Sequence, residues 1–141
     1  MGKNAKYCID YAKPNPVYPS FRPKIDPKIV KSVVTIDDQT VPSAEFYADT
    51  NWIMPGFDGD LKLAEPHTHK FGEMLGFYGF NYDNIQDLGA EIAIVIDGEN
   101  NVLERSFAAY VPPGIEHGPI IVRNVKRPIF WVSSGRAPRY E

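Results

Sequence analysis

Cysteine and long apolar runs are scarce in this sequence of 141 residues. A single cysteine, Cys8, excludes a disulfide within the chain, and no histidine near it suggests a redox or metal motif. No stretch approaches the roughly 20 consecutive apolar residues of a membrane span. The first ten residues also lack the apolar run that follows the positive charges of a leader peptide. We therefore expect a soluble, cytoplasmic protein that does not act in a membrane.

Positive charge is not in excess either. Lys and Arg number 15 against 18 Asp and Glu, which gives a formal net charge of −3. The charges alternate along the chain, so no basic stripe is available for a phosphate backbone, and nucleic acid is excluded as an expected partner. Phosphate-cradling glycine loops, nicotinamide fingerprints and Ser or Lys nucleophile motifs are also missing.

The length predicts one domain preceded by an unusual segment. Between Pro14 and Pro27, "PNPVYPSFRPKIDP" contains five prolines, which excludes a helix or a central strand there. We assign residues 1–30 to a proline-rich N-terminal arm and residues 31–141 to the folded domain. The arm is either a flexible tail or an ordered segment anchored by Tyr18 and Phe21.

The remaining chain reads as strands. Runs of β-branched and aromatic residues recur between Gly, Pro, Asn and Asp. The clearest unit is a hairpin over 91–111, in which Ile92, Ile94 and Ile96 alternate with other residues before the turn "DGENN". Further strands are predicted over 31–36, 43–54, 67–79, 118–125 and 127–134. One short helical turn is predicted over 82–89. The pattern favours an antiparallel sandwich or small barrel with the three isoleucines and Phe130 or Trp131 inside.

Two of the three histidines stand in "EPHTHKFGE". If residues 67–73 form a continuous strand, then His67, His69 and Glu73 project to the same face. Neutral imidazoles and a carboxylate are ligands that suit divalent transition metals. The third histidine, His117, follows a stiff turn with Gly114 in "VPPGIEHGP", which fixes where His117 points.

These two motifs resemble those of the cupin superfamily, which are small jelly-roll β-barrels. The first motif stands here as His67, His69, Glu73 and Gly79, and the second as Pro112, Gly114 and His117. The similarity of pattern extends over about residues 40–135. It implies an all-β cupin barrel whose ligands to one divalent metal per chain are His67, His69, Glu73 and His117. Iron, manganese, nickel and zinc all remain open as the metal.

The sequence departs from the family pattern at several turn glycines. Leu61 and Ser106 stand where the pattern has glycine, and Gly79 lies one residue closer to Glu73 than usual. The departures concern connections, whereas the ligand positions are kept. We therefore expect the metal site to be retained and the loops to differ.

A site of three imidazoles and one carboxylate around a divalent ion has a net charge of about +1 and suits an anionic small molecule. Tyr110, Tyr78 and Arg123 are candidate catalytic or substrate-binding residues. The resemblance implies a metal-dependent enzyme acting on a small organic acid or sugar-like substrate, as a dioxygenase, decarboxylase, lyase or isomerase. The alternative is a binding or sensing module whose metal is structural or holds the ligand. We expect the metal to lie in a pocket open at one end.

The aromatic and proline content of the arm predicts a role in assembly. Prolines reduce the entropy lost when such a segment becomes ordered, and a jelly roll has sheet edges that need covering. We expect a homodimer with the arm in its interface, while the chain's own barrel is the other surface that the arm can cover.

Overall fold

A computed structural model describes residues 2–141, and nearly all of its regular structure is β. A short 3-10 helix, η1 (Ala5–Tyr7), precedes the strands. The strands are β1 (Val30–Ile36), β2 (Tyr47–Ile53), β3 (Leu61–Ala64), β4 (Glu73–Tyr78), β5 (Asp87–Ile96), β6 (Glu99–Arg105), β7 (Phe107–Val111), β8 (His117–Arg123) and β9 (Ile129–Gly135).

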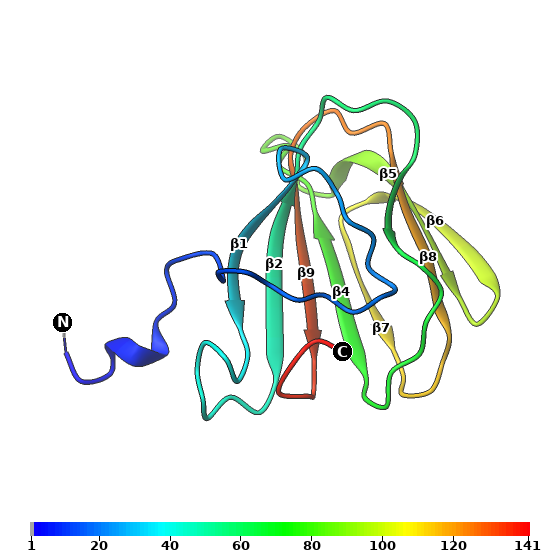
Figure 1. Cartoon of the computed structure of the whole chain (residues 1–141). Coiled ribbons are helices and arrows are strands. Elements are labelled where there is room, and N and C mark those ends of the chain that lie inside the picture. Colours follow the sequence, from blue (N-terminus) through cyan, green and yellow to red (C-terminus); the bar gives the residue numbers. More distant parts are fainter. Residues whose placement is uncertain (1) are drawn as a thin grey trace.

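The strands form two antiparallel sheets (Figure 1). One has five strands in the order β1-β2-β9-β4-β7, and the other has four in the order β3-β8-β5-β6. Neighbours such as β2 and β9 are distant in sequence, as in a jelly roll. The chain passes from one sheet to the other between β6 and β7 through Ser106 alone, so the sandwich is closed on that side. The prediction of an all-β cupin-type jelly roll is confirmed.

Alternation along the strands builds the core. In β2 and β9 every second residue is buried, and these side chains face the opposite sheet. Ile92, Ile94 and Trp131 are buried as predicted, whereas Ile96 is half-buried and packs against the core. Phe130 belongs to the outward set of β9, so Trp131 is the inward residue of the pair.

Two local predictions are wrong. Residues 82–86 form turns rather than a helical turn. The Asn84 N–H donates to the Asn81 carbonyl and the Asp83 N–H donates to the Asn81 side chain, so Asn81 holds the chain in a turn. Residues 67–79 are not one strand, since β4 begins only at Glu73. His67 makes an isolated bridge, and the chain from 68 to 72 is irregular.

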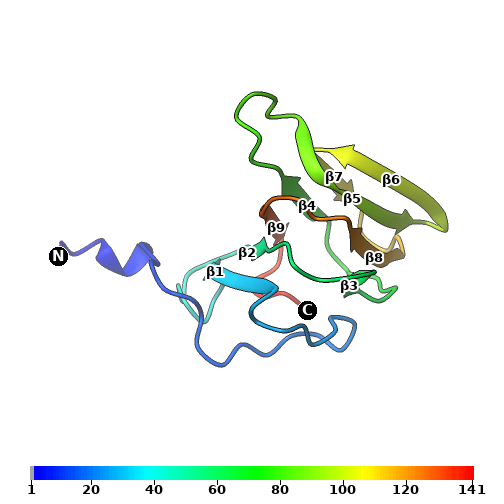
Figure 2. The ribbon, with the colours of Figure 1, turned by 90° about the horizontal axis from the view of Figure 1, so that it is seen from above.

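The arm lies on the chain's own barrel. It runs from beyond β1 toward β3 and returns to the start of β1 (Figures 1 and 2). Two main-chain bonds hold it: Glu65 N–H donates to the Phe21 carbonyl at 2.7 Å, and Met54 N–H donates to the Ile29 carbonyl at 2.8 Å. Phe21 and Ile25 pack against the core from this side. The arm therefore closes the open seam between the edge strands of the two sheets.

The outer face of the five-stranded sheet carries little charge. Across β2, β9, β4 and β7 the strand registers place the outward residues in three rows, and exposed Lys31 of the edge strand β1 lies outside this set beside Trp52. The rows are Trp52, Phe130 and Tyr78; Thr50, Val132, Gly76 and Ala108; and Ala48, Ser134, Met74 and Tyr110. We call this set the uncharged sheet face. A sheet face exposed to water normally carries charged and polar residues, so this composition is unusual.

Among residues 2–141, no helix has the length and apolar character needed to cross a membrane.

Truncation of the core tests this packing. Ile92 has no exposed surface, so Ile92→Ala should lower the free energy of unfolding by about 2–5 kcal/mol through lost burial and the cavity left behind. Val102→Thr, on an exposed β6 position, should change it by less than about 0.5 kcal/mol. Chemical denaturation measures both values, and equal effects of the two substitutions would contradict the assigned core.

Candidate metal centre

Main-chain pairing brings the two histidine motifs together. His67 N–H donates to the His117 carbonyl at 2.9 Å, and His117 N–H donates to the His67 carbonyl at 3.0 Å. Gly114 N–H donates to the His69 carbonyl at 2.8 Å. Gly114 has φ +79°, a left-handed conformation that favours glycine. The turn before β8 is thereby fixed against the irregular segment before β4.

This pairing gathers all four predicted ligands. His67, His69, Glu73 and His117 each offer one ligand atom, and these atoms lie within 4.8 Å of one another. Glu73 and His117 are 1% exposed and His69 is 7% exposed, while His67 is half-buried. Although residues 67–73 are not a continuous strand, the side chains converge as the sequence predicted. We call these four residues the His-Glu cluster.

Carbonyl groups fix the tautomers of two of the histidines. His67 Nδ1 lies 2.7 Å from the Glu65 carbonyl oxygen, and His117 Nδ1 lies 3.1 Å from the Ile115 carbonyl oxygen. A carbonyl can only accept, so each Nδ1 carries the hydrogen and donates it. With the hydrogen on Nδ1, the Nε2 atom of each ring carries the lone pair that can bind a metal, and such second-sphere bonds are typical of metal-binding histidines.

Glu73 is held as a carboxylate. Its Oε1 is 3.3 Å from His117 Nε2, its Oε2 is 3.5 Å from His69 Nε2, and the Tyr47 hydroxyl donates to Oε2. Burial opposes ionisation, but the neighbouring imidazoles of His117 and His69 and the Tyr47 hydroxyl outweigh it and lower the pKa of Glu73 to about 2. Burial, with the Glu73 charge beside it, raises the pKa of Tyr47, so its hydroxyl stays protonated and remains a donor.

His67 is held neutral. Burial, which disfavours the imidazolium, lowers its pKa to about 4 against the opposing effect of the Glu65 carbonyl. The neighbouring His117 and His69 add to the decrease. An uncharged imidazole is the form that binds metal ions.

The cluster fits a divalent ion by two independent features. First, His67 Nε2 and His69 Nε2 are buried and have no hydrogen-bond partner. A buried polar atom without a partner is costly, and a bound metal would remove that cost. Second, three neutral imidazoles and one carboxylate are the donors that iron, manganese, nickel or zinc accept.

Aromatic rings cover the cluster. The Phe21 ring is parallel to His67 at a centroid distance of 3.5 Å and an interplanar angle of 3°. Phe21 also meets His69 edge-on at 5.4 Å, and Tyr140 packs on Phe21 at 5.6 Å. On the other side, Phe71 stacks on His69 at 4.7 Å. The prediction of a pocket open at one end is therefore not met on the His67 side, where the arm lies.

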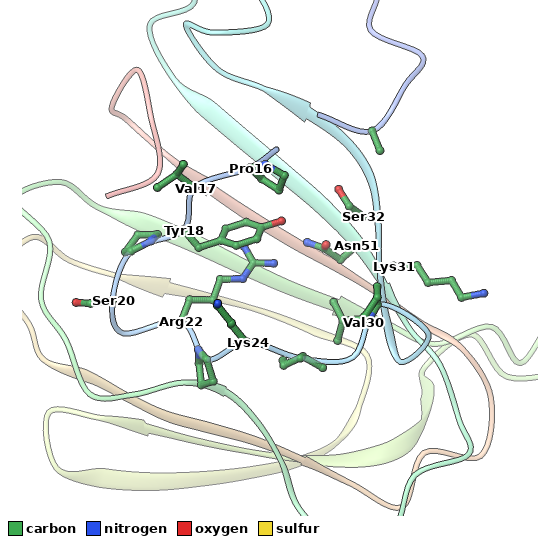
Figure 3. A pocket seen from close by; sticks show the side chains of 15 residues that line it. Pro16, Val17, Tyr18, Ser20, Arg22, Lys24, Val30, Lys31, Ser32 and Asn51 are labelled. Carbon is green, nitrogen blue, oxygen red and sulfur yellow. The ribbon is translucent and has the colours of Figure 1, made fainter. Parts of the chain in front are cut away.

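A buried ion pair accompanies this cover. Arg22 is 8% exposed, and its Nη1 donates to Asp49 Oδ2 at 2.8 Å. Thr35 and Asn51 donate to the same carboxylate. The guanidinium group lies 3.9 Å from the centroid of the Tyr18 ring and 4.9 Å from that of Trp131. Beside this pair, a cavity of about 1090 Å³ separates the arm from β1 and β2, with Tyr18, Arg22 and Asn51 in its wall (Figure 3).

The other candidate residues lie away from the cluster. Tyr110 is 65% exposed on the uncharged sheet face, and the Tyr78 hydroxyl lies over Gly76 on that face. Arg123 pairs with Asp60 at 2.7 Å and with Glu91 at 3.2 Å. The structure thus brings none of the three to the His-Glu cluster.

Sequence reasoning missed Tyr47, Arg22 and Tyr140 as neighbours of the cluster. Tyr47 carries a usable signal, because it alternates with Asp49 and Asn51 on a strand that must have one buried face. Arg22 and Tyr140 carry none, since each lies in a segment without regular structure.

Removal of the Tyr47 hydroxyl tests its bond to Glu73. Hydrogen bonds to a buried charged group contribute roughly 1.5–3 kcal/mol. Tyr47→Phe should lower the free energy of unfolding of the metal-free protein by about that amount, measured by chemical denaturation. Tyr110→Phe, whose hydroxyl is on the exposed outer face, is the matched control and should leave it unchanged.

No family model and no curated protein matches this sequence. Solved structures do resemble it. An oxalate oxidase in complex with glycolate has a TM-score of 0.52 and 16% identity over 82% of this chain. Peruvianin-I, a cysteine peptidase from Thevetia peruviana latex, has a TM-score of 0.52 and 12% identity over 85% of this chain and 69% of its own.

A cupin protein from Bacteroides fragilis has a TM-score of 0.48 and 16% identity, covering 84% of this chain and 86% of its own. The chain spans 55% of the length of the oxalate oxidase that it resembles. The two facing antiparallel sheets agree with the likeness to the oxalate oxidase and to Peruvianin-I. The fold of this chain is a jelly roll of the cupin type.

Proposed function

We propose that His67, His69, Glu73 and His117 bind one divalent transition metal per chain. The observation that carries the proposal is the convergence of their ligand atoms within 4.8 Å, together with two buried imidazole nitrogens that lack any other partner. The surroundings support the charge state that binding needs. His67 is neutral, Glu73 is ionised, and the Nδ1 hydrogens of His67 and His117 point to carbonyls.

We propose further that the chain is a metal-dependent enzyme acting on a small organic acid or a sugar-like substrate. A divalent ion in this site would act as a Lewis acid toward an anionic ligand or as a centre for dioxygen chemistry. The chain's own residues would contribute position and charge. Tyr47 holds Glu73, the two carbonyls orient the imidazoles, and the net charge of about +1 favours an anion. Glycolate in the similar oxalate oxidase supports a small carboxylate as the ligand class. The candidate reactions are those of a dioxygenase, a decarboxylase, a lyase or an isomerase.

A second candidate is a ligand-binding or sensing module in which the metal holds the ligand or the fold. The cover of Phe21 and Tyr140 over the His-Glu cluster favours this alternative, because a structural metal needs no access. Thermal stabilisation of the metal-loaded protein by glycolate or oxalate, with turnover of neither compound, would favour the module. Oxygen uptake or carbon dioxide release with either acid would favour the enzyme.

We also propose that the chain forms a homodimer. Since the arm packs on its own barrel, the uncharged sheet face is the better candidate for the interface. At about 4.8 Å per strand and 3.4 Å per residue, a face of this size presents on the order of 500 Å² on each copy. Two copies would bury on the order of 1,000 Å², the lower bound for a specific interface. The absence of charge from its three rows removes the cost of desolvating ions.

The division into an arm over residues 1–30 and a barrel over residues 31–141 is part of the proposal, and the start of β1 at Val30 supports it. A cytoplasmic location is likewise proposed, with the single free cysteine, Cys8, as its support.

Metal analysis tests the first proposal. Protein purified without a histidine tag should contain about one divalent metal per chain, measured by plasma mass spectrometry after dialysis. Glu73→Gln removes the carboxylate charge inside the cluster and should lower the metal affinity by at least tenfold. Glu116→Gln makes the same change on the exposed neighbour of His117 and should leave the affinity unchanged. Equal loss in both variants, or a wild type without metal, would refute the site.

Light scattering tests the dimer. Val132 lies in the middle row of the uncharged sheet face, so Val132→Glu should halve the mass by placing two carboxylates in the interface. Val102→Glu makes the same change on exposed β6 of the other sheet and should keep the dimer. Circular dichroism checks that both variants are folded. A monomeric wild type contradicts the proposal.

A further inference from the structure

Residues 18–25 of the arm, which we call the closing segment, contact the His-Glu cluster directly. The Phe21 ring covers the face of His67 in a parallel stack at 3.5 Å and reaches the edge of His69 at 5.4 Å. A ring this near two of the four proposed ligands stands between the cluster and the seam that the arm closes. Any molecule that approaches the cluster from this seam must displace Phe21.

Few bonds hold the closing segment. It has no regular secondary structure, and its main-chain link to the barrel is the bond from Glu65 N–H to the Phe21 carbonyl. The Arg22–Asp49 pair adds an anchor. A buried ion pair returns little net free energy, because both ions are hydrated once it separates. Segments with few backbone hydrogen bonds to the rest of the fold open locally at a lower free energy than the core strands do.

Space for movement lies beside the closing segment. Figure 3 shows Tyr18 and Arg22 directed into the cavity of about 1090 Å³, with Ser32 and Asn51 on the barrel wall opposite. This cavity is lined by the arm together with β1 and β2, and none of the four cluster residues lines it. The segment therefore has loosely packed space on one flank and the cluster on the other. A shift of the segment would release the contacts that Phe21 and Ile25 make with the buried core, whereas the strands pair with one another and not with the segment.

We propose that the closing segment is a gate to the metal centre and that Phe21 is the residue that determines access. In the closed state Phe21 stacks on His67, and the Arg22–Asp49 pair retains the segment. In the open state the Phe21 ring leaves His67, and a small anion or a chelator can reach the ion. The inference rests on the proposed metal site but concerns a different property, namely the rate of exchange rather than the ligands.

Release of Co²⁺ from the loaded full-length protein to excess EDTA measures access, followed by the loss of visible absorption. Phe21→Ala should accelerate release at least tenfold while the loaded protein still holds about one Co²⁺ per chain. Phe46→Ala is the matched control, because it truncates an exposed phenylalanine outside the arm, and it should release Co²⁺ at the wild-type rate. Release from Phe21→Ala at the wild-type rate would overturn the gate.

Amide exchange tests the motion without metal. The Glu65 N–H bonds to Phe21 of the closing segment, whereas the His117 N–H bonds to His67 and does not involve the arm. Exchange followed by NMR in the metal-free protein should be faster for Glu65 than for His117, and faster still for Glu65 in Phe21→Ala. If Glu65 exchanges only at the rate of global unfolding, the gate is refuted. A protein without metal affinity but with rapid Glu65 exchange would refute the proposed function and retain the moving segment.

Discussion

The pair of main-chain hydrogen bonds between His67 and His117 is the constraint on which the end of the barrel depends. Glu73 begins β4 in the five-stranded sheet, and His117 begins β8 in the four-stranded sheet. The bonded pair fastens the segment before one strand to the start of the other. It thereby sets the separation of the sheets where the 3.3 Å contact between Glu73 and His117 crosses the interior. The ligand geometry is a property of the backbone as much as of the side chains.

Burying a carboxylate at this position has consequences for its surroundings. Glu73 is 1% exposed, and an unpaired buried charge would cost several kcal/mol. The Tyr47 hydroxyl donates to it, and the imidazoles of His117 and His69 lie beside it at 3.3 and 3.5 Å. The same polar set serves two states, because a metal ion can replace the contacts that the imidazoles make with Glu73.

The sequence predicted the four cluster residues because histidine is rare in this chain, with three in all, and because the spacing of the two motifs is informative. It also predicted the strands that alternate clearly, such as the one carrying Ile92 and Ile94. The prediction of a continuous strand from His67 to Glu73 was wrong, because His67 forms an isolated bridge with His117 instead. The alternation of residues that predicts a strand is local in the sequence, whereas this bridge joins residues that are far apart in it. For the same reason, the contact of Phe21 with His67 had no signal in a proline-rich segment that fits several surfaces.

The placement of all three histidines in one cluster makes them natural spectroscopic reporters. In most proteins, imidazole resonances come from scattered surface positions and must be separated from those of the site. Here every imidazole signal originates at the His-Glu cluster, and two of the rings have an assigned Nδ1 hydrogen bond. Nitrogen-15 labelling of histidine alone would therefore give a spectrum of this one region, without signals from other parts of the barrel.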